Sequence, residues 1–147
     1  MKILKIGLIA SAFAMLLISC KTVAQSSQIE SITFRNTYGR GGFTSITATK
    51  DSLIATSAGG RMTDYPNFNK KINSKDWEKL VSGLDISVID KTQNGARRGV
   101  YDGHDEIFSI VTKDKEYEIF NASEDAQNYK QLEKLKTNLN NLLSQYK

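Results

Sequence analysis

The sequence predicts an α+β fold in which an antiparallel sheet of about five strands carries two amphipathic helices on one face, in the order β-β-β-α-β-β-α. Short runs rich in β-branched residues are separated by glycines or by two-residue turns, which indicates hairpins. Two longer segments place apolar residues at helical spacing. About 125 residues remain after an N-terminal signal, which is enough chain for one domain with one core.

The first twenty residues have the pattern of a secretory signal peptide. Lys2 and Lys5 form a positive head, and residues 6–18 are an almost wholly apolar run that ends at Ser19 and Cys20. The run is shorter than the ~20 apolar residues that a membrane-spanning helix needs. We therefore expect export, with residues 1–19 as the signal peptide.

The end of this segment, Leu17-Ile18-Ser19-Cys20, resembles the lipobox of bacterial lipoproteins. In that family the cysteine receives a diacylglyceride, the chain is cut just before it, and fatty acyl groups such as palmitate anchor the protein. The resemblance implies lipidation of Cys20, and Lys21 in the next position implies the outer membrane, on its periplasmic side. A second interpretation stays open, because cleavage after Ala24 would yield a secreted or soluble periplasmic protein.

The remaining chain divides into a polar tether, residues 20–28, and a single domain, residues 29–147. The chain has 20 basic and 16 acidic residues, and two of the lysines leave with the signal. Charges of both signs are interspersed, which argues against a nucleic-acid partner. Cys20 is the only cysteine, so the domain has neither a disulfide nor a thiolate site.

The first half of the domain predicts a three-stranded antiparallel meander. Alternating and β-branched residues mark strands at 29–37, 43–49 and 52–56. Glycines between positions 39 and 42 provide the first turn, because glycine tolerates positive φ. Lys50-Asp51 forms the second turn, between two β-branched runs.

A loop is expected over residues 57–72, which contain the only proline. The helix after it begins at an Asn73 cap, with Asp76 three residues on, close to a capping box. Its apolar stripe has the spacing i, i+3, i+4 and i+7 and consists of Trp77, Leu80, Val81 and Leu84. Residues 85–90 are either the frayed end of this helix or a short strand, and their β-branched residues favour the strand.

The last third predicts a loop at 91–105, strands at 106–112 and 116–120, and a long helix. Ser123 is the expected cap of that helix, and the two acidic residues after it suit the positive end of the helix dipole. The apolar positions keep helical spacing to the end of the chain: Tyr129, Leu132, Leu135, Leu139, Leu142, Leu143 and Tyr146.

The loop before the fifth strand gathers side chains suited to binding, namely Arg97, Arg98, Asp102, His104 and Asp105. Two carboxylates and an imidazole suit a divalent ion or an acid–base pair, and the arginines suit an anion. Turn formation, solubility and an internal arginine–carboxylate pair explain the same residues. Because no second histidine or H-E-x-x-H spacing is present, we predict no metal site. Structural pairing is the favoured explanation of the loop, and ligand binding by these five residues is kept as the alternative.

The sequence contains no recognisable catalytic constellation or cofactor motif. No serine lies in G-x-S-x-G, and the first glycine-rich segment leads into a strand rather than a helix, unlike a phosphate loop. These observations favour a non-enzymatic protein without a cofactor. Four aromatic residues in or near the loops would form a recognition patch if they gather on one surface: Tyr38, Phe43, Tyr65 and Phe68.

The whole chain resembles the small envelope lipoproteins of Gram-negative bacteria. The resemblance depends on the box at 17–20, a β-rich middle, the glycine- and arginine-containing loop at 97–103 and the closing leucine helix. It implies a location and no activity. We expect a lipid-anchored, non-enzymatic module of the cell envelope that binds an envelope protein through an open sheet face or the aromatic loops. The alternative is a small ligand-binding protein or hydrolase that uses the Arg97–Asp105 loop.

Overall fold

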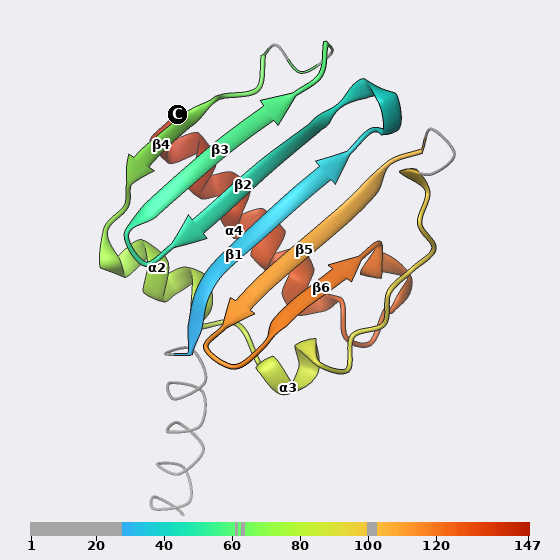
Figure 1. Ribbon diagram of the computed structural model, residues 1–147. Helices are drawn as coiled ribbons and strands as arrows, with labels where there is room; N and C mark the ends of the chain where they lie inside the picture. Colours follow the sequence, from blue (N-terminus) through green and yellow to red (C-terminus); the bar gives the residue numbers. More distant parts are fainter. Residues whose placement is uncertain (1–27, 61, 63, 100–102) are drawn as a thin grey trace, which may run out of the picture.

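Six antiparallel strands form one sheet in a computed structural model that describes residues 28–60, 62, 64–99 and 103–147. The strands are β1 Ile29–Thr37, β2 Phe43–Thr49, β3 Ser52–Ala58, β4 Phe68–Lys71, β5 Asp105–Thr112 and β6 Glu116–Phe120. The helices are α2 Ser74–Val81, α3 Ile86–Ile89 and α4 Lys130–Tyr146, with 3-10 turns η1 Gly39–Gly41 and η3 Ala122–Glu124. The order across the sheet is β4-β3-β2-β1-β5-β6, so a meander and a hairpin meet at β1 (Figure 1).

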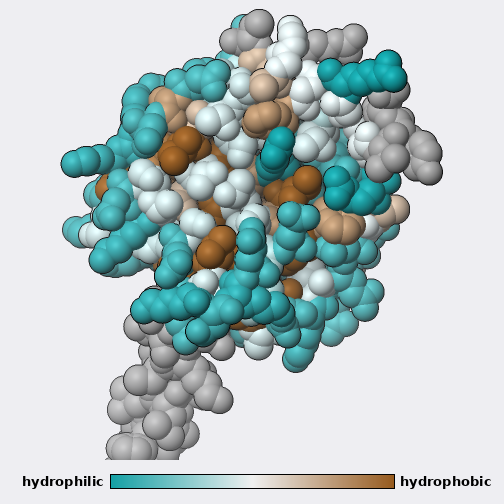
Figure 2. Space-filling model, viewed as in Figure 1, coloured by the Kyte–Doolittle hydropathy of each residue, from teal (hydrophilic) through white to brown (hydrophobic). Residues whose placement is uncertain are grey.

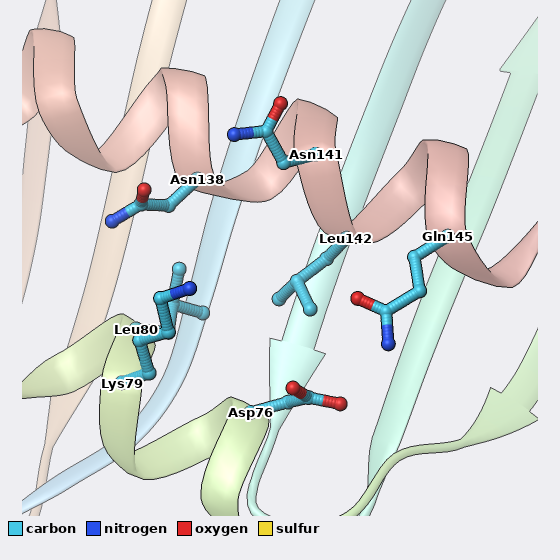
Figure 3. Close-up of a pocket in the computed structure, with 7 residues that line it drawn as sticks. All are labelled: Asp76, Lys79, Leu80, Asn138, Asn141, Leu142 and Gln145. Atoms are coloured by element: carbon cyan, nitrogen blue, oxygen red, sulfur yellow. The ribbon is translucent and has the colours of Figure 1, made fainter.

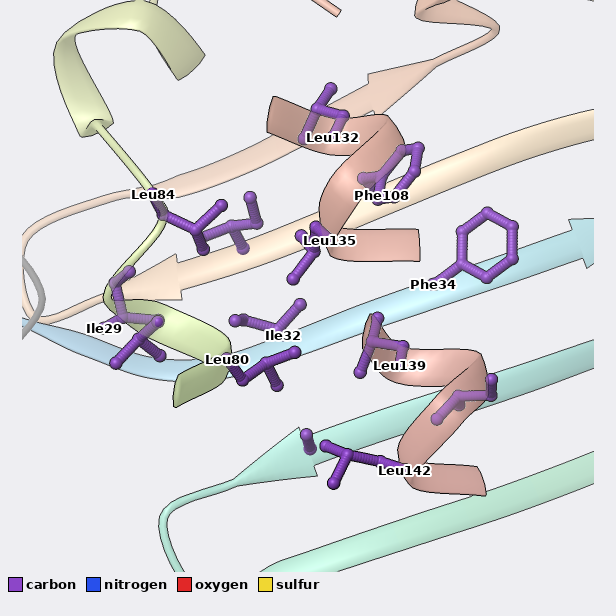
Figure 4. Packing of buried hydrophobic residues seen from close by; sticks show 14 of the residues in the cluster. Ile29, Ile32, Phe34, Leu80, Leu84, Phe108, Leu132, Leu135, Leu139 and Leu142 are labelled. Carbon is purple, nitrogen blue, oxygen red and sulfur yellow. The ribbon is translucent and has the colours of Figure 1, made fainter. Parts of the chain in front are cut away.

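The core lies between the sheet and α4, which crosses the sheet obliquely (Figure 1). Leucines of α4 point at strand residues such as Ile32 and Phe108 (Figure 4). Full burial of a leucine stabilises the fold by roughly 2 kcal/mol, so this stripe supplies much of the driving force. The arrangement confirms the predicted α+β class, with helices on one face. We call this side of the sheet the helix face.

Helix α2 packs beside α4 and begins at the predicted cap. Asn73 Oδ1 accepts a hydrogen bond from Asp76 N at 2.9 Å, and Asn73 Nδ2 donates to Asp76 Oδ2 at 2.7 Å. Tyr146 at the end of α4 donates its hydroxyl to the same carboxylate at 2.6 Å. The cap therefore also joins the start of α2 to the end of α4. Among the described residues, no helix is both long and apolar enough to cross a membrane.

Two glycines are required where the β1–β2 turn meets the end of β3. Gly42 and Gly59 have φ values of 109° and 113°, which side chains disfavour. A Cβ on Gly42 would lie 1.9 Å from the carbonyl oxygen of Ala58. Glycine thus allows the two backbone segments to touch.

Strand β4 corrects the expected loop over residues 57–72. Its four residues pair with β3, from Ser52 opposite Lys71 to Ala55 opposite Phe68. The sequence lacks a strand signal here because the segment is short and carries two lysines, a composition that suits a sheet edge. The sheet therefore has six strands instead of five.

Two further expectations, one for residues 86–89 and one for the cap of α4, are wrong. Residues 86–89 form the short helix α3 rather than a strand, because Asp85 Oδ1 accepts hydrogen bonds from the backbone and hydroxyl of Ser87. Ser123 lies in η3 and does not cap α4. Asp125 instead forms a turn with Asn128, and α4 begins at Lys130.

The opposite face of the sheet, here called the open face, carries no helix among the described elements. Its centre is rich in serine and threonine, and Thr33 and Thr47 share a hydrogen bond of 2.9 Å across β1 and β2. Ile54, Ile107 and Val111 are half-buried among these hydroxyls. Figure 2 shows the face with hydrophobic groups scattered in a weakly polar centre and a hydrophilic rim.

Candidate functional site

One row of inward-facing positions on the helix face is polar although its neighbours are apolar. Along β1, the residues that face the helices are Ile32, Phe34 and then Asn36. The inward-facing residues of β2, β3 and β5 likewise change from apolar to polar at the same end of the sheet. The polar members lie directly opposite one another across four strands, in the order Ser57, Thr44, Asn36 and Glu106. A continuous polar row therefore runs across this end of the sheet.

The polar row borders a hollow of about 480 Å³ at one corner of the domain. The last turn of α4 forms one side, and four residues between β3 and β4 form another, namely Met62, Asp64, Tyr65 and Pro66. We call this hollow the corner groove and define it by Asn36, Tyr38, Thr44, Tyr65, Leu143 and Ser144. It exists because α4 crosses the sheet at an angle and leaves these strand ends uncovered.

Tyr38 and His104 form an aromatic pair at the rim of the corner groove. Their ring centroids lie 5.1 Å apart with an angle of 24° between the planes, and Tyr38 is 36% exposed. His104 Nε2 lies 2.9 Å from Asn36 Oδ1, and because an amide oxygen only accepts, this ring nitrogen donates. His104 thus orients both Tyr38 and the amide of Asn36.

Several polar groups of the corner groove remain available to a ligand. Within the described part of the chain, neither Asn36 Nδ2 nor Thr44 Oγ1 makes a side-chain hydrogen bond to another residue. Burial, and secondarily the nearby Tyr38, raises the pKa of Tyr65 to about 12. Its hydroxyl therefore stays protonated at neutral pH and can donate as well as accept.

Glu106 closes the other end of the polar row with its charge balanced internally. Lys136 from α4 donates to Glu106 Oε1, and the Tyr129 hydroxyl donates to Glu106 Oε2 at 3.3 Å. Burial, and next the charge of Glu106, raises the pKa of Tyr129 to about 12. The cluster joins α4 to β5 and adds no net charge to the groove.

The loop singled out by sequence is organised around Asp105, whose side chain is fully buried. Arg97 Nε donates to Asp105 Oδ2 at 2.9 Å, while Arg98 N and Asn121 Nδ2 donate to Oδ1 at 2.6 and 2.7 Å. Burial by itself would raise the pKa of Asp105. The hydrogen bonds from Arg98, Asn121, Arg97 and Gly99 outweigh burial and hold the pKa well below its usual range.

Asn121 and Gly99 make this close packing possible. Asn121 adopts the left-handed conformation at φ 50°, which lets its Nδ2 reach Ala96 O at 2.6 Å as well as Asp105. A Cβ on Gly99 would lie 2.7 Å from Asp105 Oδ2. Arg98 also pairs with Glu124 at 2.7 Å. The loop is thereby fastened to the end of β6 and to η3.

The structure brings Arg97, Arg98 and Asp105 together and separates His104 from them. Successive residues of a strand point to opposite faces, so His104 turns to the corner groove while Asp105 turns to the loop. Asp102 and Cys20 lie outside the described residues. The carboxylate of Asp105 already accepts donors from four residues, and a ligand would have to displace one of them.

A second hollow, of about 60 Å³, lies between α2 and α4. Figure 3 shows Leu80 and Leu142 among polar side chains that extend from both helices. Its volume holds a few water molecules at most. Among the residues that the structure describes, no three histidine, cysteine or acidic side chains gather to hold a metal ion.

The chain matches no protein-family model, and no curated protein matches it significantly.

The sequence indicates only part of the corner groove. Tyr38 and Tyr65 gather there, whereas Phe43 lies under Arg35 and Phe68 packs against the core. The sequence alone does not single out Asn36 or Thr44. In the sequence, these positions are marked only by the loss of apolar alternation at one end of each strand. The strand register is needed to show that the polar residues lie opposite one another.

Proposed function

We propose that the protein is a lipid-anchored, non-enzymatic binding module of the bacterial cell envelope, and that the corner groove is its binding site. The observation that carries the binding site is the polar row on an otherwise apolar face, beside an exposed aromatic pair. Polar residues at core-facing positions weaken a fold unless they serve another purpose. Ser57 and Glu106 have partners within the domain, so the purpose that we assign to the row is ligand binding through Asn36 and Thr44.

The proposed location is the outer membrane, facing the periplasm. It rests on the apolar run before Leu17-Ile18-Ser19-Cys20 and on the resemblance of these four residues to a lipobox. β1 enters the domain at Ile29 and reaches the groove at Asn36, seven residues later. At about 3.3 Å per residue, the groove lies roughly 23 Å from the point where the tether joins the domain. This separation would keep the groove accessible beside a membrane.

The alternative is a ligand-binding or hydrolytic site in the Arg97–Asp105 loop. Such a site would need Arg97 or Asp105 to exchange an internal partner for the ligand. The corner groove needs no such exchange, because the Asn36 amide nitrogen and the Thr44 hydroxyl make no side-chain hydrogen bonds within the described chain. We therefore favour the groove and assign the loop a supporting part, since it leads into His104.

Mass spectrometry of the mature N-terminus tests the anchor. We expect a triacylated Cys20 as first residue of protein isolated from membranes. An unmodified N-terminus at Gln25 would show that the cysteine is discarded and would overturn the lipid anchor.

Photo-crosslinking in cells tests the binding site. A benzophenone amino acid at position 38 or position 65 should give adducts of one common mass, because both residues line the same groove. The same group at position 54, on the open face, is the matched control and should not give that adduct. A further substitution, Ser144→Trp, should fill the groove and reduce the adduct. Adducts equal at all three positions, or none at the groove positions, would contradict the proposal.

A further inference from the structure

We propose that the corner groove binds a neutral oligosaccharide, stacked on Tyr38 and hydrogen-bonded to Asn36. This inference rests on the proposed function, because it names the class of ligand that the same groove takes.

The first argument is the presentation of the Tyr38 ring. Tyr38 is the one large hydrophobic side chain that is exposed among the described residues, at 36%. His104 stacks against the Tyr38 ring with the centroids 5.1 Å apart. This contact covers one face of the Tyr38 ring and holds the ring in place. A pyranose ring carries a face of C–H groups that packs on such a platform, while a flat apolar partner surface would need more than one exposed ring.

The second argument is the set of hydrogen-bonding groups beside the ring. The amide oxygen of Asn36 accepts a hydrogen bond from His104. The amide nitrogen of Asn36 therefore points away from His104 and is the group that we expect to donate to a ligand. Thr44 and the protonated hydroxyl of Tyr65 line the same hollow. Ser144 lines it too, and its hydroxyl, which donates to Asn140 O, can still accept. Sugar hydroxyls both donate and accept, and side-chain amides and hydroxyls of this kind satisfy them in a fixed direction.

The third argument is charge. Asp64 and Lys147 bring one charge of each sign to the groove, and Glu106 is bonded to Lys136 at the end of the polar row. A phosphate or nucleotide site would need a surplus of cationic donors, which this balance does not provide. The formal charges of the described lining residues therefore cancel, which favours a neutral ligand over an anion.

The fourth argument is size. The hollow of about 480 Å³ falls in the ~300–1,000 Å³ range of small-ligand sites. It lies at the surface between α4 and the β3–β4 segment rather than inside the core. One or two sugar rings can therefore lie in it while the rest of an oligosaccharide continues into solvent.

Calorimetric titration of the mature, lipidated chain in detergent micelles tests the inference. The probes are chitotriose, cellotriose, maltotriose and mannotriose, which differ in linkage and substituents but are all neutral. We expect at least one to bind with a dissociation constant of about 1 mM or tighter. Tyr38→Ala should weaken that binding by about tenfold or more, because it removes the platform.

Tyr117→Ala is the matched control, because it removes a tyrosine from β6, away from the groove. Its dissociation constant should equal that of the unchanged protein. If Tyr38→Ala does not fold, Ser144→Trp provides the second variant, since Ser144 is exposed on α4 and a larger side chain there blocks the groove without touching the core.

Absence of binding by all four sugars, or binding that survives both groove variants, would overturn the inference. The crosslinking experiment separates this failure from failure of the proposed function. A groove-specific adduct that is a protein, with no sugar bound, leaves a binding module and removes the saccharide. Loss of both the adduct and the sugar binding removes both proposals.

Discussion

Asp105 is a buried carboxylate that organises a polar loop from within. It accepts hydrogen bonds from two backbone N–H groups and two side chains, so the loop, the end of β6 and the start of β5 meet at a single group. Charge-assisted hydrogen bonds are about twice as strong as neutral ones, which explains how a charged group is tolerated without exposure.

Replacement of Asp105 by alanine should destabilise the domain by about 3 kcal/mol, since Arg98 N would lose its acceptor inside the protein and Asn121 Nδ2 would keep only Ala96 O. Urea unfolding of the variant measures this loss. Glu124→Gln is the control, because its pair with Arg98 is exposed and should be worth at most about 1 kcal/mol. Equal effects of the two changes would contradict the central part given to Asp105.

The lowered pKa of Asp105 leads us to predict a loss of stability in acid. The pKa of Asp105 is lowered in the folded state, so the folded state binds this proton less readily than the unfolded chain does. Its stabilising contribution is complete above the ordinary carboxyl pKa of about 4 and is lost as the pH falls below that value. Urea unfolding between neutral pH and pH 2 should show the difference between the protein and Asp105→Asn shrinking with acidity. A constant difference would exclude this linkage.

The raised pKa values of two tyrosines lead us to predict a loss of stability in alkali. The pKa values of Tyr65 and Tyr129 are raised to about 12, so each stabilises the fold up to about pH 10, and this contribution is lost as the pH rises toward 12. Tyrosinate absorbance should show these two side chains ionising late. Tyr65→Phe and Tyr129→Phe should each remove one late-titrating group. Ionisation of all tyrosines near pH 10 in the folded protein would be inconsistent with the described burial.

At the scale of elements, α4 contributes most to holding the layers together. Leu139 is completely buried, whereas Asn141 on the same helix is exposed. Leu139→Ala should cost 2–5 kcal/mol of unfolding free energy, and Asn141→Ala should leave stability within about 0.5 kcal/mol. Chemical denaturation of both variants checks the assignment. A small loss for Leu139→Ala would mean that α4 is not packed as described.

Elements with clear periodicity are predictable from the sequence, and elements defined by their neighbours are not. β1, β2, β5 and β6 lie within one residue of their expected ranges, because alternation and turn residues agree there. β4 has no alternation of its own and becomes a strand by pairing with β3. Residues 86–89 have strand-forming composition, yet the local cap at Asp85 makes them helical.

The candidate site is less predictable than the fold, for a similar reason. Arg97 and Asp105 stand out in the sequence because charged residues cluster there, and the structure pairs them internally. Asn36, Thr44 and Glu106 look unremarkable singly. They form a row only because the strand register aligns them, and register depends on long-range pairing.

At the scale of the whole molecule, we propose that a lipid on Cys20 attaches the protein to the membrane. Cys20→Ser should therefore move the protein from the membrane to the soluble fraction, while thermal unfolding of the domain keeps the same midpoint. Cell fractionation followed by calorimetry of both forms checks this. Membrane association that survives Cys20→Ser would point to attachment by another part of the chain.

The proposed binding groove lies at the end of the sheet remote from Ile29, where the domain begins. The intact mass of the protein crosslinked in cells through position 38 tests this most directly. We expect a lipidated chain that carries one adduct of defined mass, and this adduct should be absent when the crosslinker stands at position 54. A lipidated chain without an adduct at position 38, or with the same adduct at position 54, would contradict it.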